Sequence, residues 1–123
     1  MSSLALSYVV NLLARREYSE FELRNKMQEK AFTEDEIDET IAHCQKKNWQ
    51  NDKRFTENYL HARSQRGYGA NRIKQELRQL KGVSSDVINE VLVESEINWT
   101  ELAEKVLRKK FPNYSEDRKS TRL

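Results

Sequence analysis

The side chains best suited to chemistry in this chain are positively charged and gathered in its middle. Residues 53–81 contain eight lysines and arginines and two acids, whereas the whole chain of 123 residues has a formal net charge of only +2. Residues 82–104 contain six acids and no base, and residues 105–123 are basic again. Such opposed blocks attract partners that are themselves charged, such as phosphate groups or acidic protein surfaces. The sequence therefore predicts binding of a charged macromolecule.

Three cations of the basic segment fall on one face of an expected helix. Lys74, Arg78 and Lys81 follow steps of four and three residues, about 100° from the apolar stripe and therefore facing outward. That stripe is expected to consist of Ile73, Leu77 and Leu80. Arg72 lies on the other flank, where Glu76 can pair with it. A solvated helix face would show the same pattern, but the concentration of charge in one segment favours a binding surface.

Four aromatic residues recur at equivalent places about fifty residues apart. Tyr18 and Tyr68 precede or lie in turns, and Trp49 and Trp99 follow apolar helical stretches. Recurrence of this kind is typical of packing residues, although aromatic rings next to cations also stack on nucleic-acid bases. Tyr68, which two glycines flank and which lies close to Arg66, is the best candidate for base stacking.

Catalytic and metal-binding patterns are absent from the sequence. His43 and Cys44 are adjacent and point in different directions on a helix, and His61 is isolated, so no metal site is expected. No glycine-rich phosphate-binding motif occurs, and we expect neither a cofactor nor an enzyme. A lone cysteine suits a reducing compartment. Without a signal sequence or an apolar run of ~18 residues, the chain is expected to be cytoplasmic and not to enter a membrane.

The spacing of apolar residues predicts an all-α protein. The chain has only three glycines and one proline, and its apolar residues recur at three- and four-residue steps, which indicates seven helices. Capping boxes are expected at Ser19 and Thr33, each with a glutamate three residues later. Asp52 is expected to cap the fourth helix and Gly67 to end it, and the fifth helix is expected over about residues 69–81.

The same spacing predicts which residues are buried in two further helices. In the first helix, over about residues 4–16, we expect burial of Leu6, Val9 and Leu13. In the fourth helix we expect burial of Phe55, Tyr59 and Ala62.

An internal repeat of about fifty residues organises these helices. Residues 12–27 align with residues 61–77, and Trp49 then aligns with Trp99. Each unit reads as three helices in a helix-turn-helix-like arrangement that buries its own apolar stripe only marginally. Adjacent units should therefore stack into an elongated tandem.

The repeat predicts two complete units and the beginning of a third. We expect the first three-helix unit over residues 1–50, the second over residues 51–98 and the first helix of an incomplete third unit over residues 99–111. Residues 112–123 are polar and lack apolar periodicity, so a disordered tail is expected there.

Several motifs together resemble the RecX family, the bacterial regulators of the RecA recombinase. They read LARREYS at 13–19, NDKRF at 51–55, RGYG at 66–69 and RIKQEL at 72–77, and the resemblance extends over about residues 4–111. The family usually has proline where this chain has Ala70. Relatives also complete the third repeat, so the resemblance implies that this chain is truncated there.

The resemblance implies a function as well as a fold. Members form curved, elongated tandems of three-helix repeats, bind RecA and the RecA filament on single-stranded DNA, and inhibit recombinase and ATPase activity in recombination, DNA repair and the SOS response. They are not enzymes, and several bind DNA weakly. The alternative is a direct, sequence-nonspecific DNA-binding helical module that acts without RecA. A helical scaffold for another acidic partner is a third possibility.

Charge and resemblance together suggest which residues meet RecA or DNA. The protein is expected to be a monomer that uses the basic face of the second unit, with support from arginines of the first. The expected binding residues are Arg15, Arg16, Arg24, Arg63, Arg66, Tyr68, Arg72, Lys74, Arg78 and Lys81.

Overall fold

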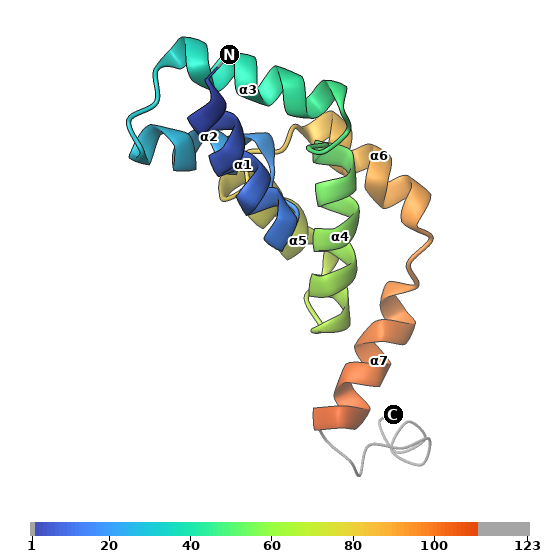
Figure 1. Cartoon of the computed structure of the whole chain (residues 1–123). Helices are drawn as coiled ribbons and strands as arrows, with labels where there is room; N and C mark the ends of the chain where they lie inside the picture. The colour runs from blue at the N-terminus through green and yellow to red at the C-terminus, as the bar shows by residue number, and fades with distance from the viewer. Residues whose placement is uncertain (1, 111–123) are drawn as a thin grey trace, which may run out of the picture.

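The computed structural model describes residues 2–110, which form helices joined by short turns (Figure 1). In chain order the helices are α1 (Ser3–Arg15), α2 (Glu20–Glu29), α3 (Glu34–Lys46), α4 (Asp52–Gln65), α5 (Ala70–Gln79), α6 (Ser85–Ser95) and α7 (Trp99–Lys110). The described part of the chain contains no strand, and the prediction of an all-α fold is confirmed. The tail predicted over residues 112–123 lies outside the described residues.

Local hydrogen bonds begin and end the helices largely as expected. Ser19 and Thr33 both form complete capping boxes, so both predictions are confirmed. Gly67 follows the end of α4 with φ +92°, a left-handed conformation that glycine adopts without steric cost. The prediction for the start of α4 was wrong by one residue, because the Asn51 side chain accepts the hydrogen bond from the Arg54 N–H at 3.0 Å. Asp52 is thereby left to bond elsewhere.

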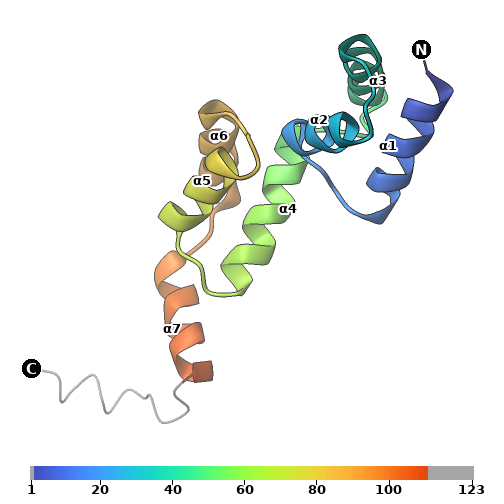
Figure 2. The same cartoon turned by 90° about the vertical axis from the view of Figure 1, so that its left-hand side faces the viewer.

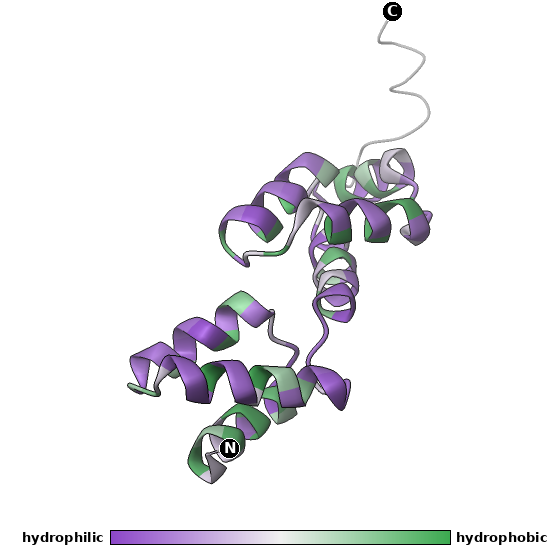
Figure 3. Ribbon diagram, turned by 90° about the horizontal axis from the view of Figure 1, so that it is seen from above, coloured by the Kyte–Doolittle hydropathy of each residue, from purple (hydrophilic) through white to green (hydrophobic). Residues whose placement is uncertain are grey.

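The helices form two groups, each with a core of its own. One core contains buried residues from positions 5–44 and the other from positions 55–91, and no buried residue belongs to both. Figure 2 shows α1, α2 and α3 at one end of an elongated molecule, α4, α5 and α6 in the middle, and α7 at the other end. In both groups hydrophobic segments alternate with hydrophilic ones along the helices (Figure 3). Two small amphipathic bundles thus stand in tandem. Unit boundaries at residues 50 and 98 stay predictions; they fall in the turns before α4 and α7.

The buried face of α1 differs from the prediction. Ala5, Val9 and Leu12 are buried, whereas Leu6 and Leu13 only pack against the edge of the core. Residues 4–14 carry apolar side chains nearly all round the helix, so the spacing alone did not select one face. Contacts with α2 and α3 select it instead.

The buried faces of α4 and α5 also differ from the prediction. The buried residues of α4 are Phe55, Thr56, Leu60 and Ser64. Tyr59 is half-buried and Ala62 is exposed, contrary to the expectation. Polar residues enter this core because their hydroxyls bond within the helix, as the Thr56 hydroxyl does to the Asp52 carbonyl at 2.7 Å. Leu80 is 63% exposed, because α5 ends before it and the chain turns away.

Helix α7 packs loosely on the second unit: Trp99 at its start is partly buried against the second core. A Cβ atom at Gly67 would lie 2.9 Å from a methyl group of Val106, so α7 lies close against the turn that follows α4. None of its residues is buried. No helix within residues 2–110 has the length and apolar character needed to cross a membrane.

Gly82 provides a test of how the two groups meet. Its φ is +65°, and a Cβ atom at this position would overlap the ring of Phe21 in α2. We expect Gly82→Ala to lower the free energy of unfolding by about 1–2 kcal/mol from backbone strain, with a further loss from displacing Phe21. Equilibrium urea denaturation measures the change.

Gly69→Ala is the matched control, because its φ is −78° and nothing lies within 4 Å of the added carbon. Its effect should stay within about 0.5 kcal/mol. Equal losses in the two variants would contradict the close approach of Gly82 to Phe21.

Candidate macromolecule-binding surface

Two arginines and a tyrosine of the second unit surround one glutamate, and a second tyrosine lies against both arginines. Tyr59 donates a hydrogen bond to Glu76 at 2.7 Å, and the nearest nitrogens of Arg63 and Arg72 lie 3.7 and 3.3 Å from the same carboxylate. The two guanidinium carbons lie 5.3 and 4.0 Å from the centre of the Tyr68 ring. These five residues, at positions 59, 63, 68, 72 and 76, form one cluster. It combines helices α4 and α5 with the turn between them.

Hydrogen bonding keeps Glu76 ionised. The bond from the Tyr59 hydroxyl lowers the pKa of Glu76 and outweighs the opposing effect of burial, and Arg72 and Arg63 lower it further. Burial and the bond to this carboxylate raise the pKa of Tyr59 in turn. The glutamate therefore offsets part of the positive charge of both arginines. Guanidinium groups already cover the Tyr68 ring, so the geometry favours packing over base stacking.

The remaining cations of the second unit differ in how exposed they are and in whether they have partners, unlike the uniform basic face that the sequence predicts. Arg66 is exposed and Lys74 is half-buried, and neither side chain has a partner among residues 2–110. Arg78 donates a hydrogen bond to the hydroxyl of Ser85. Arg66 and Lys74 are therefore the cations of this unit most available to a partner.

Lys81 differs from the expectation that it faces outward. Its ammonium group lies 3.0 Å from a carboxylate oxygen of Glu22, and only 25% of its side chain is exposed. Glu22 belongs to the first unit, 59 residues earlier, so helical periodicity contained no sign of this pair. Lys81 connects the two units, and Glu22 largely neutralises its charge within the chain.

The arginines of the first unit divide in the same way. Arg16 pairs with Glu22 at 3.2 Å and covers the ring of Tyr18. Arg24 pairs with Glu20 and Asp38 at 3.0 and 2.8 Å. Arg15 is exposed and has no side-chain partner in the described chain. Tertiary structure thus leaves Arg15 as the available cation of these three.

A buried polar junction holds the two units together. The Gln50 side-chain amide is 1% exposed and donates to the Tyr18 carbonyl at 3.1 Å and to Asp52 at 2.9 Å. Asp52 also accepts from the backbone N–H of Glu20 at 2.9 Å. The buried Ser19 hydroxyl donates to the carbonyl of Lys81 at 2.7 Å.

An ion pair strengthens the same junction. A nitrogen of Arg54 lies 2.8 Å from the Glu17 carboxylate, and its other two guanidinium nitrogens donate hydrogen bonds to the carbonyls of Asn48 and Trp49. Sequence reasoning missed these residues, because polar side chains in turns read as solvent-exposed. The only signal was Asp52, which was interpreted as the cap of the fourth helix.

Nothing in the described residues forms a metal centre. Residues 2–110 contain no group of three or more histidine, cysteine, aspartate or glutamate side chains that could hold a metal ion. The lone cysteine, Cys44, is buried in the first core, and burial raises the pKa of its thiol.

The fold and the surface define a class of protein: an all-α tandem of three-helix units with a charged outer surface. The family model described as "RecX, first three-helix domain" matches residues 5–44, and the model of the second three-helix domain matches residues 51–92. The chain is 73% identical over 116 residues to the regulatory protein RecX of Haemophilus influenzae (strain PittEE), covering 94% of this chain and 76% of that protein. The chain belongs to the RecX family of regulatory proteins.

Other relatives agree with this assignment. The regulatory protein RecX of Pasteurella multocida (strain Pm70) is 67% identical, over 94% of this chain and 71% of its own length. A crystal structure of regulatory protein RecX matches with a TM-score of 0.75 at 22% identity, a likeness that shows the fold. The match covers 96% of this chain and 61% of the solved chain.

The ion pairs of Glu22 predict how stability depends on pH. Burial opposes ionisation of Glu22, but hydrogen bonds from Arg16, from the Ser19 backbone and from Lys81 outweigh it and lower its pKa below the ordinary 4.5. Glu22 therefore stabilises the fold above that pH, and the contribution is lost as the pH falls through the lowered pKa. Glu22→Gln should cost about 1–2 kcal/mol at neutral pH and should flatten the loss of stability in acid.

Denaturation midpoints measured from neutral pH down to pH 3 would test this. Glu29→Gln is the control, because Glu29 is exposed and its side chain has no partner among residues 2–110. Its curve should follow that of the unmodified chain. Parallel curves for the Glu22 variant and the unmodified chain would show that the junction does not depend on this charge.

Proposed function

We propose that this protein binds RecA, including the RecA filament on single-stranded DNA, and lowers its recombinase and ATPase activity. The observation that supports this most directly is family membership, with 73% identity to a regulatory protein RecX. Recombination, DNA repair and the SOS response are the processes in which such a regulator acts. The protein works in the cytoplasm as a monomer and is not an enzyme.

The charge distribution supports a partner that is itself charged in patches. Arg66 and Lys74 present unpaired cations from the second unit, and Arg72 remains 61% exposed although it pairs with Glu76. Arg15 presents another cation from the first unit. These cations would contact acidic surface on the filament or nearby DNA phosphate. The acidic residues within 82–104 would contact basic patches on the filament.

The remaining expected binding residues take a different part in this proposal. Arg16, Arg24, Arg63, Arg78 and Lys81 all have partners within the chain. They position the helices that carry the available cations. Tyr68 holds Arg63 and Arg72 in place by stacking, which leaves the outer side of Arg72 for a partner.

A direct test measures ATP hydrolysis by RecA on single-stranded DNA. Purified protein at several-fold excess should lower the steady-state rate, because a molecule bound to the filament hinders its growth and turnover. An unchanged rate at that excess would rule the proposed function out.

Charge reversal tests which surface is used. The double variant Arg66→Glu, Lys74→Glu should raise the concentration needed for half-maximal inhibition about tenfold, equivalent to about 1.4 kcal/mol of binding. Helicity should be unchanged, because neither residue belongs to the buried core. Lys26→Glu, Lys30→Glu is the matched control, since it reverses two charges on α2 and its C-terminus. Equal losses in both double variants would indicate nonspecific attraction.

The second candidate function is direct, sequence-nonspecific DNA binding without RecA. The exposed, unpaired cations of Arg66 and Arg15 favour it, because each is free to contact a phosphate. Contact with about four phosphates would give a slope of roughly −3 to −4 for log affinity against log salt concentration. A flat response on bare DNA would exclude this candidate and leave the proposal for RecA unaffected.

A further inference from the structure

Two hollows lie on either side of the last turn of α1 and share Leu13 and Ala14 in their walls. The larger has a volume of about 530 Å³ and lies between the end of α1 and α4, with Arg15 and Asn58 in its lining. The smaller has a volume of about 260 Å³. We call both together the junction groove, lined by Val10, Leu13, Ala14, Arg15, Arg16, Glu17, Trp49, Phe55, Asn58 and Tyr59.

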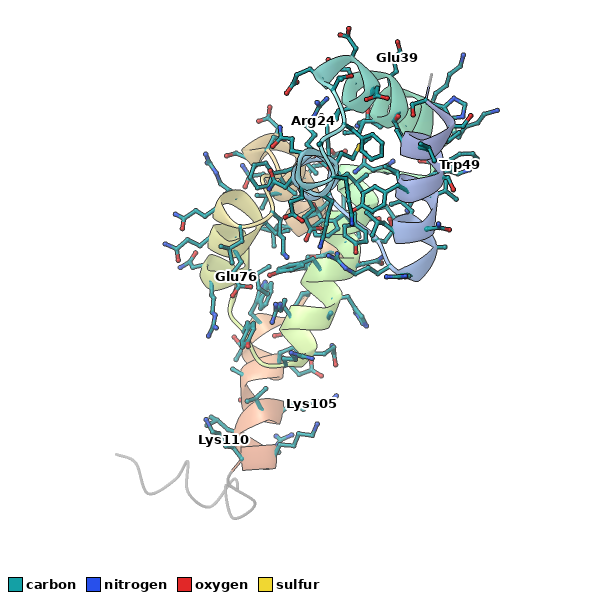
Figure 4. The ribbon with its side chains drawn as sticks, turned by 60° about the vertical axis from the view of Figure 1, so that its left-hand side comes forward. Arg24, Glu39, Trp49, Glu76, Lys105 and Lys110 are labelled. Atoms are coloured by element: carbon teal, nitrogen blue, oxygen red, sulfur yellow. The ribbon has the colours of Figure 1, made fainter. Side chains whose placement is uncertain are left out.

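The smaller hollow is lined by apolar and aromatic side chains. Its lining consists of Val10, Leu13, Ala14 and Trp49. Trp49 is 44% exposed and Val10 is 38% exposed. Figure 4 shows Trp49 beside α1, on the side of the molecule away from Glu76. Exposed tryptophan in a small apolar hollow is typical of sites that anchor a side chain of a partner.

The size of the hollow indicates what it accepts. Its volume lies below the roughly 300 Å³ at which pockets for drug-sized ligands begin. It therefore suits a single large apolar side chain rather than a whole small molecule.

The charge of the groove is limited to one available cation. Arg16 bonds to Glu22 and to the carbonyl of Glu17. Arg54, which pairs with Glu17 and donates to the carbonyls of Asn48 and Trp49, is not available either. Arg15 has no side-chain partner among residues 2–110. The groove can therefore bind one carboxylate, while the exposed amide of Asn58 can donate to or accept from a peptide backbone.

We propose that the junction groove binds a peptide segment of another protein that carries one large apolar side chain next to one carboxylate. The choice of a protein partner rests on the proposed function, although this surface is separate from Arg66 and Lys74. Single-stranded nucleic acid fits less well, because its backbone needs a series of cations and the wall contains the carboxylate of Glu17. Lys46 and Lys47, at the C-terminal end of α3, line neither hollow and so add no cation to the groove.

Nuclear magnetic resonance with two matched peptides tests the groove without RecA. The probes are the blocked hexapeptides GSDFSG and GSKFSG, titrated to millimolar concentration into the isotope-labelled chain. The acidic peptide should shift the indole resonance of Trp49 and the side-chain amide of Asn58. The basic peptide should bind about three- to fivefold more weakly, as expected for loss of one exposed ion pair. Oligothymidylate should leave both resonances in place.

Variants make the test specific. Ala14→Trp fills the shared wall of both hollows and should abolish the shifts; Ala14 is exposed, so helicity measured by circular dichroism should persist. Arg15→Glu should reverse the preference in favour of the basic peptide. Arg66→Glu, Lys74→Glu is the control and should bind the acidic peptide normally.

The outcomes separate this proposal from the proposed function. Absence of shifts, equal binding of the two peptides or shifts caused by oligothymidylate instead would overturn the groove proposal, whatever happens with RecA. If the unmodified chain leaves RecA activity unchanged, the proposed function fails, and the peptide titrations still decide about the groove. If both hold, Ala14→Trp should also weaken inhibition of RecA.

Discussion

The arrangement of this protein depends on a polar junction, because its two hydrophobic cores have no buried residue in common. The Asp52 carboxylate accepts hydrogen bonds from the Glu20 N–H and the Gln50 amide, and the Ser19 hydroxyl donates to the Lys81 carbonyl, so part-buried bonds bridge the units. A buried polar group without its partner costs about 1–3 kcal/mol, so each bond favours one relative placement. Directional bonds of this kind set an angle between two bundles, which apolar contact alone would leave variable.

The same requirement explains where the positive charge goes. A tandem of small bundles has a large surface, and cations on that surface either pair internally or remain free. Lys81 and Arg16 converge on Glu22 between the units, and Arg63 and Arg72 converge on Glu76 within the second. The basic segment is thus partly a structural device. Only the few unpaired cations are available to a partner. Recognition therefore depends on where these cations lie more than on the total charge of the chain.

Sequence reasoning was reliable where the cause is local. Capping boxes at Ser19 and Thr33 and the left-handed end of α4 at Gly67 depend on neighbours within a few residues, and all three are present. Reasoning was weaker for burial. Leu13 and Leu80 look like core residues by spacing, yet one lines a groove and the other is 63% exposed. Spacing defines an apolar face, but which part of it is covered depends on the neighbouring helix.

By itself, the sequence determined the helices, the repeat and membership of the RecX family, because each of these follows from residue types at short, regular spacings. Only the tertiary structure decided which candidate binding residues remain available. Lys81 and Arg15 are both basic residues near helix ends, but Lys81 meets Glu22 from 59 residues earlier and Arg15 meets no side chain in the described part of the chain. The physical reason is that an ion pair forms between side chains close in space, and helical periodicity contains no information about distant segments.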